Sequence, residues 1–312
     1  MGARSGKLGQ MSQSIQVEVE GRQLKLSNLD KVLYPAPGFT KAQVIDYYTR
    51  VAPALLPHMA GRPLTLKRYP DGVDGPFFYE KKCPSHRPPW FHTVSVWSER
   101  NKAEINYCVV DDLPSLVWVA NMASLELHTS LARAEDIFRP TMIVFDLDPG
   151  PPADIRQCCQ VGLELRDLFA ELKIEAFPKT SGSKGLQIYV PLNTKTSYEE
   201  TKPFALAVAQ ELERKHPALV LSNMKKELRK GKVFVDWSQN DDHKTTVCVY
   251  SLRARERPTV STPVTWDEVE AHHQGKLKQL SFTADEVLAR VERQGDLFAP
   301  VLKLRQKLPH FG

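Results

Sequence analysis

The chain has 312 residues, of which 42% are hydrophobic, and it carries a formal net charge of +5. This length accommodates one large domain or two ordinary ones, and the apolar content argues against global disorder. The N-terminus lacks an apolar signal core and no apolar run reaches about 18 residues, so neither export nor a membrane span is expected. The mild basic excess is compatible with an anionic partner without requiring one.

The cysteines are expected to be reduced thiols. They stand at five positions, Cys83, Cys108, Cys158, Cys159 and Cys248. An odd number without paired spacing argues against a disulfide framework. No Cys or His spacing matches a structural zinc site. These features favour a soluble, intracellular, globular protein.

The first half of the chain alternates between strand and helix patterns after an expected flexible tail at residues 1–14. A β-strand is expected from Ile15 to Val19, because polar and apolar residues alternate there. Thr40 is a suitable N-cap for a helix through residue 59. The other predicted elements of this half are strands at 24–26, 63–70, 91–97 and 104–110, and a helix at 113–127.

In the second half of the chain, the predicted strands are separated by two longer helices. Ser197 with Glu200 forms a capping box, and Thr283 with Glu286 caps the last helix. The predicted elements are strands at 143–148, 174–178, 186–192, 232–237 and 245–250, and helices at 153–172 and 197–215. The mixture predicts an α+β fold of two mixed α/β modules that flank one cleft.

The strand at 143–148, "IVFDLD", ends in two carboxylates. Because side chains alternate along a strand, Asp146 and Asp148 share one face with Val144, while Phe145 and Leu147 point to the other. Two residues along a strand span about 6.6 Å, so both carboxylates can approach one divalent ion or bracket two. A buried, unpaired carboxylate is costly, and a metal ion would remove that cost.

A third carboxylate, Asp236, follows the apolar residues Val233-Phe234-Val235. Oxygen-rich sites of this kind suit Mg²⁺ or Mn²⁺, and two such ions can activate an attacking oxygen and stabilise a leaving phosphate. The competing interpretation is that the aspartates accept hydrogen bonds from turn backbones, as the turn residues Pro149-Gly150 suggest. Spacing alone does not decide between the two.

The segment "TSGSKGLQIY" at 180–189 is a candidate phosphate site. Glycines let backbone N–H groups approach a phosphate closely. Ser181 and Ser183 can donate hydroxyl hydrogen bonds, and Lys184 supplies a positive charge. The spacing is not that of a Walker A motif, and Gly/Ser loops are usually turns. The position of the segment, one helix and one strand after the paired aspartates, strengthens the assignment.

Basic residues cluster near the third aspartate, in "KKELRKGK" (225–232) and "SLRARER" (251–257). Most of them are expected to form a solvated basic face. Arg229 and Arg253 are close in sequence to the Asp236 strand. They are therefore the better candidates for contacts with a triphosphate or a template.

Together, "FDLDPG", "TSGSKGLQIYVPL" and "GKVFVDWSQN…KTTV…YSLRARERPTV" resemble the polymerase domain of bacterial DNA ligase D, within the archaeo-eukaryotic primase superfamily. The resemblance runs from about Leu26 to Leu297 and includes "LSNLDKVLYP", "GRPLTLKRYPDGVDGPFFYEK" and "LELH". It implies an archaeo-eukaryotic primase-like core, with residues 15–300 as the primase-polymerase domain and 301–312 as a C-terminal tail.

The resemblance implies a template-directed nucleotidyltransferase that fills gaps in end-joining repair, commonly prefers ribonucleotides and works well with Mn²⁺. The implied ligands of two divalent ions, Mn²⁺ or Mg²⁺, are Asp146, Asp148 and Asp236. The implied nucleotide-binding residues are Lys67, His128, Ser181, Ser183, Lys184, Gln187, Lys244 and Arg253. The implied DNA-binding residues are Asn28, Lys31, Lys41, Arg68, Phe78, Tyr79 and Arg229.

The implied DNA contacts are of two kinds. Phe78 with Tyr79 would stack on template bases. Asn28, Lys31 and Lys41 would grip the 5′-phosphate of the downstream strand. The implied partners are gapped or broken DNA ends with a 5′-phosphate, NTP or dNTP, and, as candidate repair proteins, the end-binding protein Ku and a DNA ligase. The implied location is the bacterial cytoplasm, at the nucleoid.

Gln187 departs from the family pattern, which usually has histidine after "SGSKGL". Glutamine donates a hydrogen bond but cannot become a cation, so triphosphate affinity or sugar selectivity is expected to differ. The sequence has no KxDG lysine motif of an ATP-dependent ligase. We therefore expect a polymerase that stands alone or has been excised from a larger protein.

Several aromatic and histidine side chains are expected to be structural. Trp118 and Trp237 are predicted core residues, whereas His58, His92 and His216 are predicted at the surface or in loops. Without the resemblance, His128 would be interpreted as a satisfied core histidine that follows an apolar helix.

Three other functions fit parts of the pattern. A metal-dependent nuclease would use the same three carboxylates but has no need of a triphosphate site. A de novo primase is a close variant of the polymerase. A non-catalytic DNA-end-binding module would depend on the region around Asn28, Lys31 and Lys41, with structural aspartates.

Overall fold

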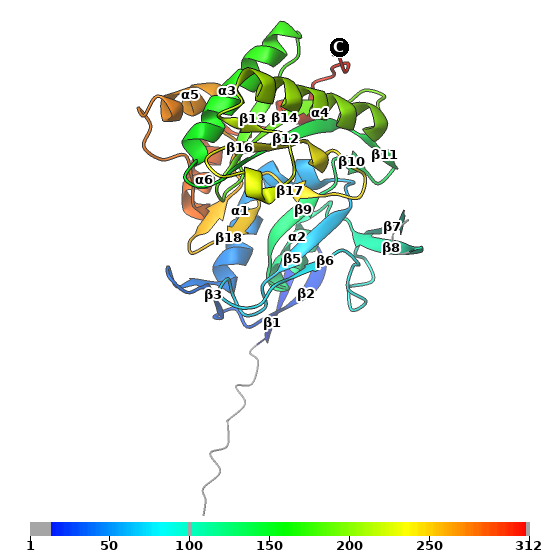
Figure 1. The fold of residues 1–312 in the computed structure, drawn as a ribbon. Helices are drawn as coiled ribbons and strands as arrows, with labels where there is room; N and C mark the ends of the chain where they lie inside the picture. Colours follow the sequence, from blue (N-terminus) through cyan, green and yellow to red (C-terminus); the bar gives the residue numbers. More distant parts are fainter. Residues whose placement is uncertain (1–13, 99–101, 310–312) are drawn as a thin grey trace, which may run out of the picture.

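The computed structural model of the chain describes residues 14–98 and 102–309. It contains two mixed α/β modules, each built on one larger β-sheet. In Figure 1 the second module, which is mostly green, lies above the first, which is mostly blue and cyan. The predicted α+β architecture of two modules is confirmed.

The first module holds a six-stranded sheet. Its strands are β5 (Leu64–Arg68), β6 (Phe78–Glu80), β7 (Thr93–Ser98), β8 (Ala103–Cys108), β9 (Ser124–Thr129) and β17 (Thr246–Val247). The strand order is β17-β9-β5-β8-β7, and β6 pairs with β5. Two helices belong to this module and pack against each other, α1 (Lys41–Met59) and α2 (Leu113–Asn121).

The predicted helix at 40–59 is confirmed as α1, and its start is explained by a capping box. The Thr40 side chain accepts a hydrogen bond from the Gln43 backbone N–H, and the Gln43 side chain accepts one from the Thr40 N–H. Two tyrosines on its buried face tie α1 to distant backbone. Tyr47 donates to the Tyr250 carbonyl (2.8 Å) and Tyr48 to the Leu125 carbonyl (2.7 Å).

The second module holds a five-stranded sheet. Its strands are β12 (Met142–Pro149), β13 (Phe177–Thr180), β14 (Leu186–Pro191), β15 (Val220–Leu221) and β16 (Val233–Asp236), in the order β13-β14-β12-β16-β15. Its helices are α3 (Ile155–Glu171), α4 (Tyr198–Lys215) and α5 (Trp266–His273). Helix α3 packs on β12 and β14, and α5 packs on α3.

Smaller elements complete the described chain. The two-stranded pairs are β1 (Ser14–Val19) with β2 (Arg22–Ser27), β3 (Val32–Tyr34) with β4 (Phe39–Thr40), β10 (Ala132–Arg133) with β11 (Asp136–Pro140), and β18 (Leu252–Ala254) with β19 (Pro258–Val260). The remaining helices are α6 (Ala284–Gln294), α7 (Pro300–Lys303) and two short 3₁₀ turns, Lys226–Leu228 and Trp237–Gln239.

Strand β12 divides its side chains between two hydrophobic cores. Val144 belongs to the core of the first module, whereas Phe145 and Leu147 belong to the core of the second. Asp146 and Asp148 follow Val144 on the same face, as the alternation predicts. The two aspartates therefore face the space between the modules.

The predicted helix at 113–127 is wrong in its second half. Helix α2 ends at Asn121, and Ala123 has a left-handed φ of 56°, which a helix cannot contain. The following residues form β9, a strand between β5 and β17 whose Leu125 and Leu127 are fully buried. Apolar residues of an interior strand resemble a buried helix in sequence, which explains the error. His128 consequently lies on a strand.

Three further expectations are corrected. Cys83 and Cys108 form a disulfide, so these two cysteines are not free thiols, whereas the other three are free. His58 is buried on α1, where its Nε2 lies 2.8 Å from an Asp296 carboxylate oxygen. Helix α6, which Thr283 caps, is followed by α7 and is therefore not the last helix.

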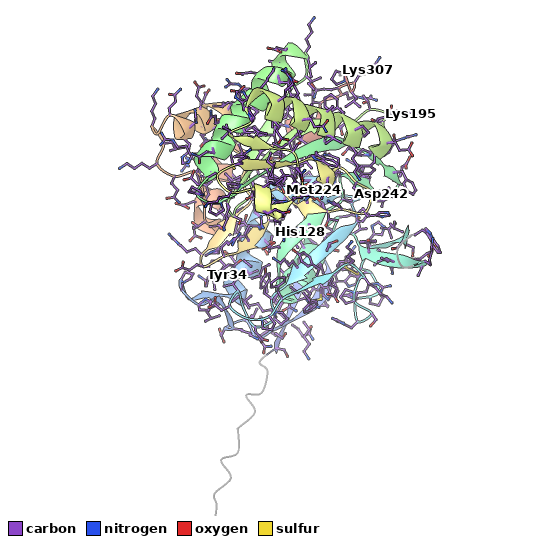
Figure 2. The ribbon with its side chains drawn as sticks, viewed as in Figure 1. Tyr34, His128, Lys195, Met224, Asp242 and Lys307 are labelled. Atoms are coloured by element: carbon purple, nitrogen blue, oxygen red, sulfur yellow. A yellow bond between two sulfur atoms is a disulfide. The ribbon has the colours of Figure 1, made fainter. Side chains whose placement is uncertain are left out.

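The ends of the chain are described only in part. Residues 1–13 of the predicted N-terminal tail lie outside the described residues, and Ser14 already belongs to β1. Near the other end, Gln306 donates from its backbone N–H to the Leu192 carbonyl (2.8 Å). The Thr194 hydroxyl donates to the Gln306 carbonyl (2.7 Å), and the next residues, Lys195 and Lys307, are labelled on the second module in Figure 2. No helix in the described part of the chain has the length and apolar content needed to cross a membrane.

Candidate active site

Three carboxylates gather where β12 and β16 pair. The antiparallel register places Asp146 opposite Asp236, and Asp148 lies two residues further along β12. Directly opposed residues of antiparallel strands have Cα atoms about 4.5–5.5 Å apart, so the two segments meet as predicted. We call Asp146, Asp148 and Asp236 the acidic cluster. Asp146 and Asp148 line a cavity of about 530 Å³ between the modules.

The carboxylates of the acidic cluster are buried close to one another, and this affects their pKa values. Burial raises the pKa of Asp146 to about 7, and the charges of Asp148 and Asp236 add to the effect. Burial and Asp236 also raise the pKa of Asp148, although Arg229 and Arg253 oppose the shift. Among the described residues, no lysine or arginine forms an ion pair with these carboxylates. Such a cluster favours a bound cation.

Asp236 is held by the 3₁₀ turn that follows its own strand. Its carboxylate accepts from the Ser238 backbone N–H (3.0 Å), the Ser238 hydroxyl (2.5 Å) and the Gln239 amide (2.8 Å). Lys244 donates to the same Ser238 hydroxyl oxygen (2.5 Å). Lys244 therefore reaches the acidic cluster through Ser238 while it lines the cavity.

The predicted phosphate segment forms a tight loop between β13 and β14 at the edge of this cavity. Gly182 has a φ of +68°, and a Cβ atom there would lie 2.5 Å from the Val260 carbonyl carbon, so the position requires glycine. The Ser181 hydroxyl oxygen accepts from the backbone N–H groups of Ser183 (3.3 Å) and Gly185 (3.1 Å). Its own proton remains available for donation.

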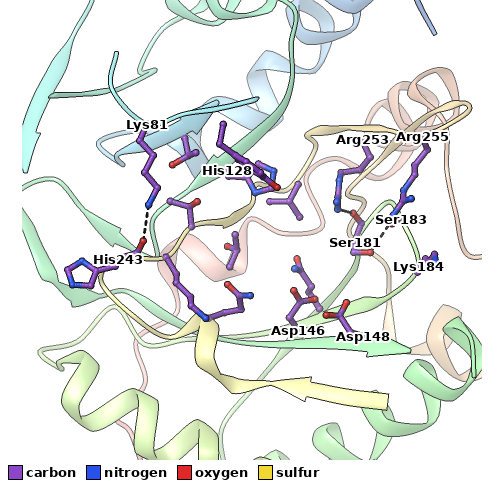
Figure 3. Close-up of a pocket in the computed structure, with 18 residues that line it drawn as sticks. Lys81, His128, Asp146, Asp148, Ser181, Ser183, Lys184, His243, Arg253 and Arg255 are labelled. Carbon is purple, nitrogen blue, oxygen red and sulfur yellow. Dashed lines mark hydrogen bonds between the residues drawn. The ribbon is translucent and has the colours of Figure 1, made fainter. Parts of the chain in front are cut away.

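Two arginines of the β18 region brace this loop. Arg253 donates to the Ser181 carbonyl, and Arg255 donates to the Ser183 hydroxyl oxygen. Ser181, Ser183 and Lys184 line the cavity together with both arginines. Figure 3 shows Asp146 and Asp148 facing this group across the cavity. Arg255 was not among the predicted site residues, because charge alone did not separate it from the neighbouring arginines.

A buried carboxylate, Glu126 on β9, organises the opposite side of the cavity. One Glu126 carboxylate oxygen lies 3.0 Å from His128 Nε2 and 3.3 Å from Arg253 Nε; the Arg253 contact is an ion pair without hydrogen-bond alignment. The other oxygen lies 3.5 Å from Lys67 Nζ and accepts from the Ala254 backbone N–H (3.1 Å). We call Lys67, His128 and Arg253, with Glu126 beneath them, the basic wall.

In the basic wall, the negative charge of Glu126 offsets the positive charges of Lys67 and Arg253. Burial acts to raise the pKa of Glu126. The His128 hydrogen bond and the charges of Arg253 and Lys67 outweigh it and hold that pKa well below its usual range. Burial lowers the pKa of His128, although Glu126 opposes the shift. Glu126 was missed as a site residue. The only signal in the sequence was Glu and His two residues apart in "LELH", on one face of a strand.

An aromatic ledge on and beside β6 flanks the basic wall. Phe78 is 43% and Tyr79 57% exposed, which is unusual for such large apolar rings. The neighbouring Phe77 ring lies 4.3 Å from Lys67 Nζ. Arg68 is bonded to Glu80 (2.8 Å) and to the Met122 carbonyl (3.0 Å), and its guanidinium covers Phe78. Tyr79 lines the cavity, so the ledge is continuous with it.

Comparison with known proteins identifies the family of this fold and site. Residues 40–298 match the family described as "LigD, primase-polymerase domain". The multifunctional non-homologous end joining protein LigD of Mycolicibacterium smegmatis is 46% identical over 280 residues, which cover 89% of this chain and 36% of that protein. The chain belongs to the LigD primase-polymerase domain family.

Other relatives agree. The bifunctional LigD of Bacillus subtilis is 33% identical over 273 residues, covering 87% of this chain and 43% of that protein. The solved "Polymerase Domain from Mycobacterium tuberculosis Ligase D in complex with DNA" matches with a TM-score of 0.84 and 42% identity, and covers 91% of this chain and 99% of that chain. The chain thus spans between about a third and a half of the length of these curated LigD relatives.

Membership of this family tests the broadest predictions made from the sequence. The predicted resemblance and its primase-polymerase fold are confirmed. As a member of this domain family the chain is a nucleotidyltransferase, and polymerases of this kind use divalent metal ions. The roles of the individual residues are not decided by family membership and are treated as proposals below.

The three residues predicted to grip a 5′-phosphate lie together outside the cavity of this primase-polymerase domain. Asn28 adopts a left-handed φ of 53°, and its carbonyl accepts from the Lys31 N–H (3.1 Å). Lys31 Nζ pairs with Asp71 (2.7 Å), and the buried Lys41 donates to the Ser27 carbonyl (2.6 Å). Burial, and then the nearby charge of Lys31, lower the pKa of Lys41 to about 8, so the two cations lie close together.

Arg229 lies on the other side of the acidic cluster. Its guanidinium stacks 3.9 Å from the Phe234 ring centroid and donates to the Met224 carbonyl (3.2 Å). A Cβ atom on Gly150 would lie 1.9 Å from the Arg229 carbonyl oxygen, so glycine after the paired aspartates lets the two backbones meet. Arg229 is therefore held beside Asp148, where its charge opposes the rise in the pKa of that carboxyl.

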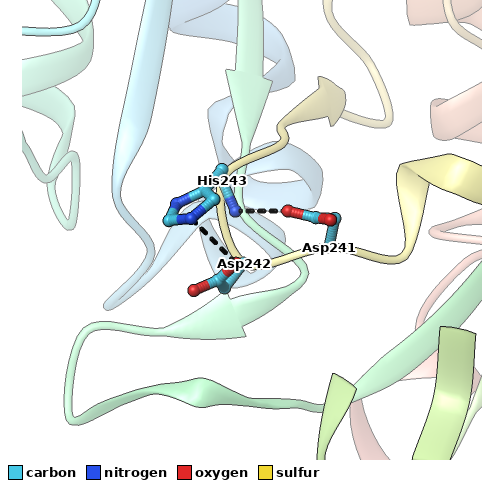
Figure 4. Close-up of side chains that lie close together, drawn as sticks. All are labelled: Asp241, Asp242 and His243. Carbon is cyan, nitrogen blue, oxygen red and sulfur yellow. Dashed lines mark hydrogen bonds and ion pairs between the residues drawn. The ribbon is translucent and has the colours of Figure 1, made fainter. Parts of the chain in front are cut away.

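Another acidic group stands beside the cavity, at Asp241, Asp242 and His243 (Figure 4). These are the only three His, Cys, Asp or Glu side chains in the described part of the chain with ligand atoms all within 4.8 Å of one another. Asp241 is already paired with Lys202 (2.6 Å) and accepts from the His243 N–H (3.0 Å). These contacts account for the arrangement without a metal ion. The three carboxylates of the acidic cluster do not all lie within this distance of one another.

Proposed function

We propose that this chain is a repair polymerase that adds nucleotides to a primer 3′ end at gaps and double-strand breaks during non-homologous end joining. The observation that carries the proposal is the acidic cluster facing the basic wall and the phosphate loop across one cavity. The LigD relatives are described as non-homologous end joining proteins, and the matched polymerase domain was solved in complex with DNA.

The acidic cluster suits a pair of divalent ions, Mn²⁺ or Mg²⁺. Its donors are carboxylate oxygens, which these ions prefer, and burial together with the charges of Asp148 and Asp236 raises the pKa of Asp146. Asp146, Asp148 and Asp236 would be the ligands. Ions bound there would lower the pKa of the attacking 3′-hydroxyl and offset charge on the departing pyrophosphate.

The phosphate loop and the basic wall would bind the incoming nucleotide. Lys184 and Arg253 stand where they can neutralise triphosphate charge, and the Ser181 and Ser183 hydroxyls can donate to phosphate oxygens. His128 and Lys67, held by Glu126, add donors beside them. Gln187 and Lys244 complete this nucleotide site from the floor of the cavity.

DNA would lie along the aromatic ledge and the outer basic residues. Phe78 and Tyr79 present exposed faces on which template bases can stack, next to Arg68. Asn28, Lys31 and Lys41 would hold the 5′-phosphate of the downstream strand, and Arg229 would contact DNA near the acidic cluster. Ku and a DNA ligase are the proposed protein partners. Such a role places the chain in the bacterial cytoplasm, at the nucleoid.

Primer extension on a gapped duplex with a 5′-phosphate tests this function. The wild type is incubated with each ribonucleotide and deoxyribonucleotide, in Mg²⁺ or Mn²⁺, and a reaction without nucleotide serves as control. We expect templated lengthening of the primer. Asp146→Ala and Asp148→Ala should abolish it while gap binding, measured by fluorescence anisotropy, survives.

The other functions give different outcomes in the same assay. A nuclease would shorten the primer, with or without nucleotides. An end-binding module would bind the gap without extending the primer and would be indifferent to Mn²⁺. Extension by either aspartate variant at the wild-type rate would show that the acidic cluster is not the catalytic centre.

A further inference from the structure

A buried lysine, Lys179, ends a row of side chains that crosses the floor of the cavity. On β13 it stands opposite Gln187 of β14, Gln187 stands opposite Asp146 of β12, and Asp146 stands opposite Asp236 of β16. Residues in register on neighbouring strands share one face of a sheet. The row therefore runs from a cation through an amide to two carboxylates.

The Lys179 amino group donates hydrogen bonds to three neutral acceptors. Its Nζ donates to Gln187 Oε1 (2.5 Å), to the Ser261 hydroxyl oxygen (2.6 Å) and to the Val247 carbonyl (3.2 Å). An ammonium has three protons, so all are accounted for. The side chain is fully buried, and none of these partners is a carboxylate. Burial disfavours the charged form of a lysine, and the three hydrogen-bond acceptors compensate only in part.

The contact with Lys179 dictates which way the Gln187 amide faces. Lys179 donates to the amide oxygen, so the amide –NH₂ group is turned to the other side. That group is turned toward Asp146, which stands opposite Gln187 on the neighbouring strand. A flipped amide would set –NH₂ against the ammonium and oxygen against the carboxylate, which is unfavourable at both ends.

We propose that Lys179 is a positioning residue that acts through Gln187 on Asp146. It fixes the Gln187 amide with its donor toward the Asp146 carboxylate, and so holds that carboxylate in one orientation. The catalytic consequence rests on the proposed function, because it requires Asp146 to serve the polymerase reaction. The orientation of the amide does not, because it belongs to the protein without nucleotide or metal.

The first experiment observes that orientation directly. In ¹⁵N-labelled protein without metal or nucleotide, the Gln187 side-chain –NH₂ resonance is assigned by its absence in Gln187→Leu. We expect slow hydrogen exchange of this group in the wild type and exchange at least about tenfold faster in Lys179→Met, which keeps the volume but removes the donors. Ser261→Ala, which removes another Lys179 partner, is the matched control and should leave the resonance in place.

The second experiment measures coupling between the two residues in primer extension. Lys179→Met and Gln187→Leu should each lower kcat about tenfold. The double variant should be no slower than Gln187→Leu alone, because both changes remove the same orientation. Ser261→Ala should retain kcat within about twofold. Melting curves locate a temperature at which every variant is folded.

A third experiment compares two variants of Gln187 and leaves Lys179 in place. It therefore tests the role of the amide orientation even if Lys179→Met does not fold. A neutral histidine can accept with one ring nitrogen and donate with the other, so Gln187→His should keep kcat within about threefold, whereas Gln187→Leu should not. Equal losses in both would overturn the proposal. So would multiplicative losses in the double variant, or an unchanged Gln187 resonance in Lys179→Met. A wild type that does not extend primers would refute the proposed function but leave the resonance test valid.

Discussion

The two sides of the cavity hold opposite charges in opposite ways. In the basic wall, Glu126 sits beneath three cationic or protonatable side chains and holds them together, so the charges are balanced within the protein. In the acidic cluster, three carboxylates face one another, and the buried Lys179 on that floor hydrogen-bonds to Gln187 and to no carboxylate.

The difference lies in charge balance: the charges of the basic wall are paired within the protein, whereas the carboxylates of the acidic cluster have no ion-pair partner among the described residues. The basic wall is a preorganised surface with low reorganisation on binding an anion, as electrostatic catalysis requires. In the acidic cluster the pKa values of Asp146 and Asp148 are raised, and a bound cation would favour the ionised carboxylates. The contrast predicts that changes in the cluster abolish chemistry, whereas changes in the wall weaken nucleotide binding.

The largest effect is expected for Asp236→Asn. The amide keeps the size of the side chain and its acceptor oxygen for Ser238, but removes one negative charge from the cluster. We expect kcat in primer extension to fall by a factor on the order of 10² to 10³. Asp242→Asn, in the acidic group beside the cavity, is the matched control and should change kcat little. Equal losses in both variants would contradict the assignment.

Glu126→Gln should break the balance of the basic wall. Three donors would then surround a group without charge, so we expect a loss of about 3–5 kcal/mol in unfolding free energy, as for other broken buried pairs. Nucleotide KM should rise by roughly tenfold or more, because Lys67, His128 and Arg253 lose their common anchor. Urea denaturation and extension kinetics measure the two effects.

The control for Glu126→Gln is Glu80→Gln, which removes the carboxylate that pairs with Arg68 on the aromatic ledge. It should leave nucleotide KM nearly unchanged. A Glu126→Gln variant that bound nucleotide more tightly than the wild type would mean that Glu126 acts by repelling phosphate and not by positioning the cations.

Phe78→Ala tests whether the aromatic ledge extends the site toward DNA. Loss of one stacking surface should weaken template binding by about tenfold, within the usual range for base–aromatic stacking. Affinity for the nucleotide alone should not change, because Phe78 does not line the cavity. Trp97→Ala, another exposed aromatic away from the ledge, is the comparison variant. Fluorescence anisotropy with gapped DNA provides the measurement.

The smallest effect is expected for Lys31→Glu. This change should weaken binding to gaps with a 5′-phosphate several-fold and reduce the salt dependence of binding by about one unit in slope. Binding to a gap with a 5′-hydroxyl, and nucleotide KM, should change less. Lys25→Glu, on the exposed side of β2, is a suitable control. Equal weakening of both gaps would argue against a separate phosphate pocket.

Local patterns were sufficient for much of the fold. The N-cap of α1, the capping box of α4 and the alternation along β12 involve residues within a few positions of one another, so the sequence predicts them directly. The loop at 180–185 was also recognisable, because its glycines and serines are consecutive. The strand β9 was misjudged as helix, because burial on both faces removes the alternation that identifies a strand.

The sequence by itself determined that Asp146 and Asp148 share a face and that "SGSKG" forms a tight loop, because strand alternation and glycine turns are local properties. Only the tertiary structure decided that Asp236 stands opposite Asp146, that Glu126 lies beneath three basic side chains, that Cys83 meets Cys108, and that Lys179 ends the row. These contacts depend on strand register and on packing between distant segments, which no short stretch of sequence encodes.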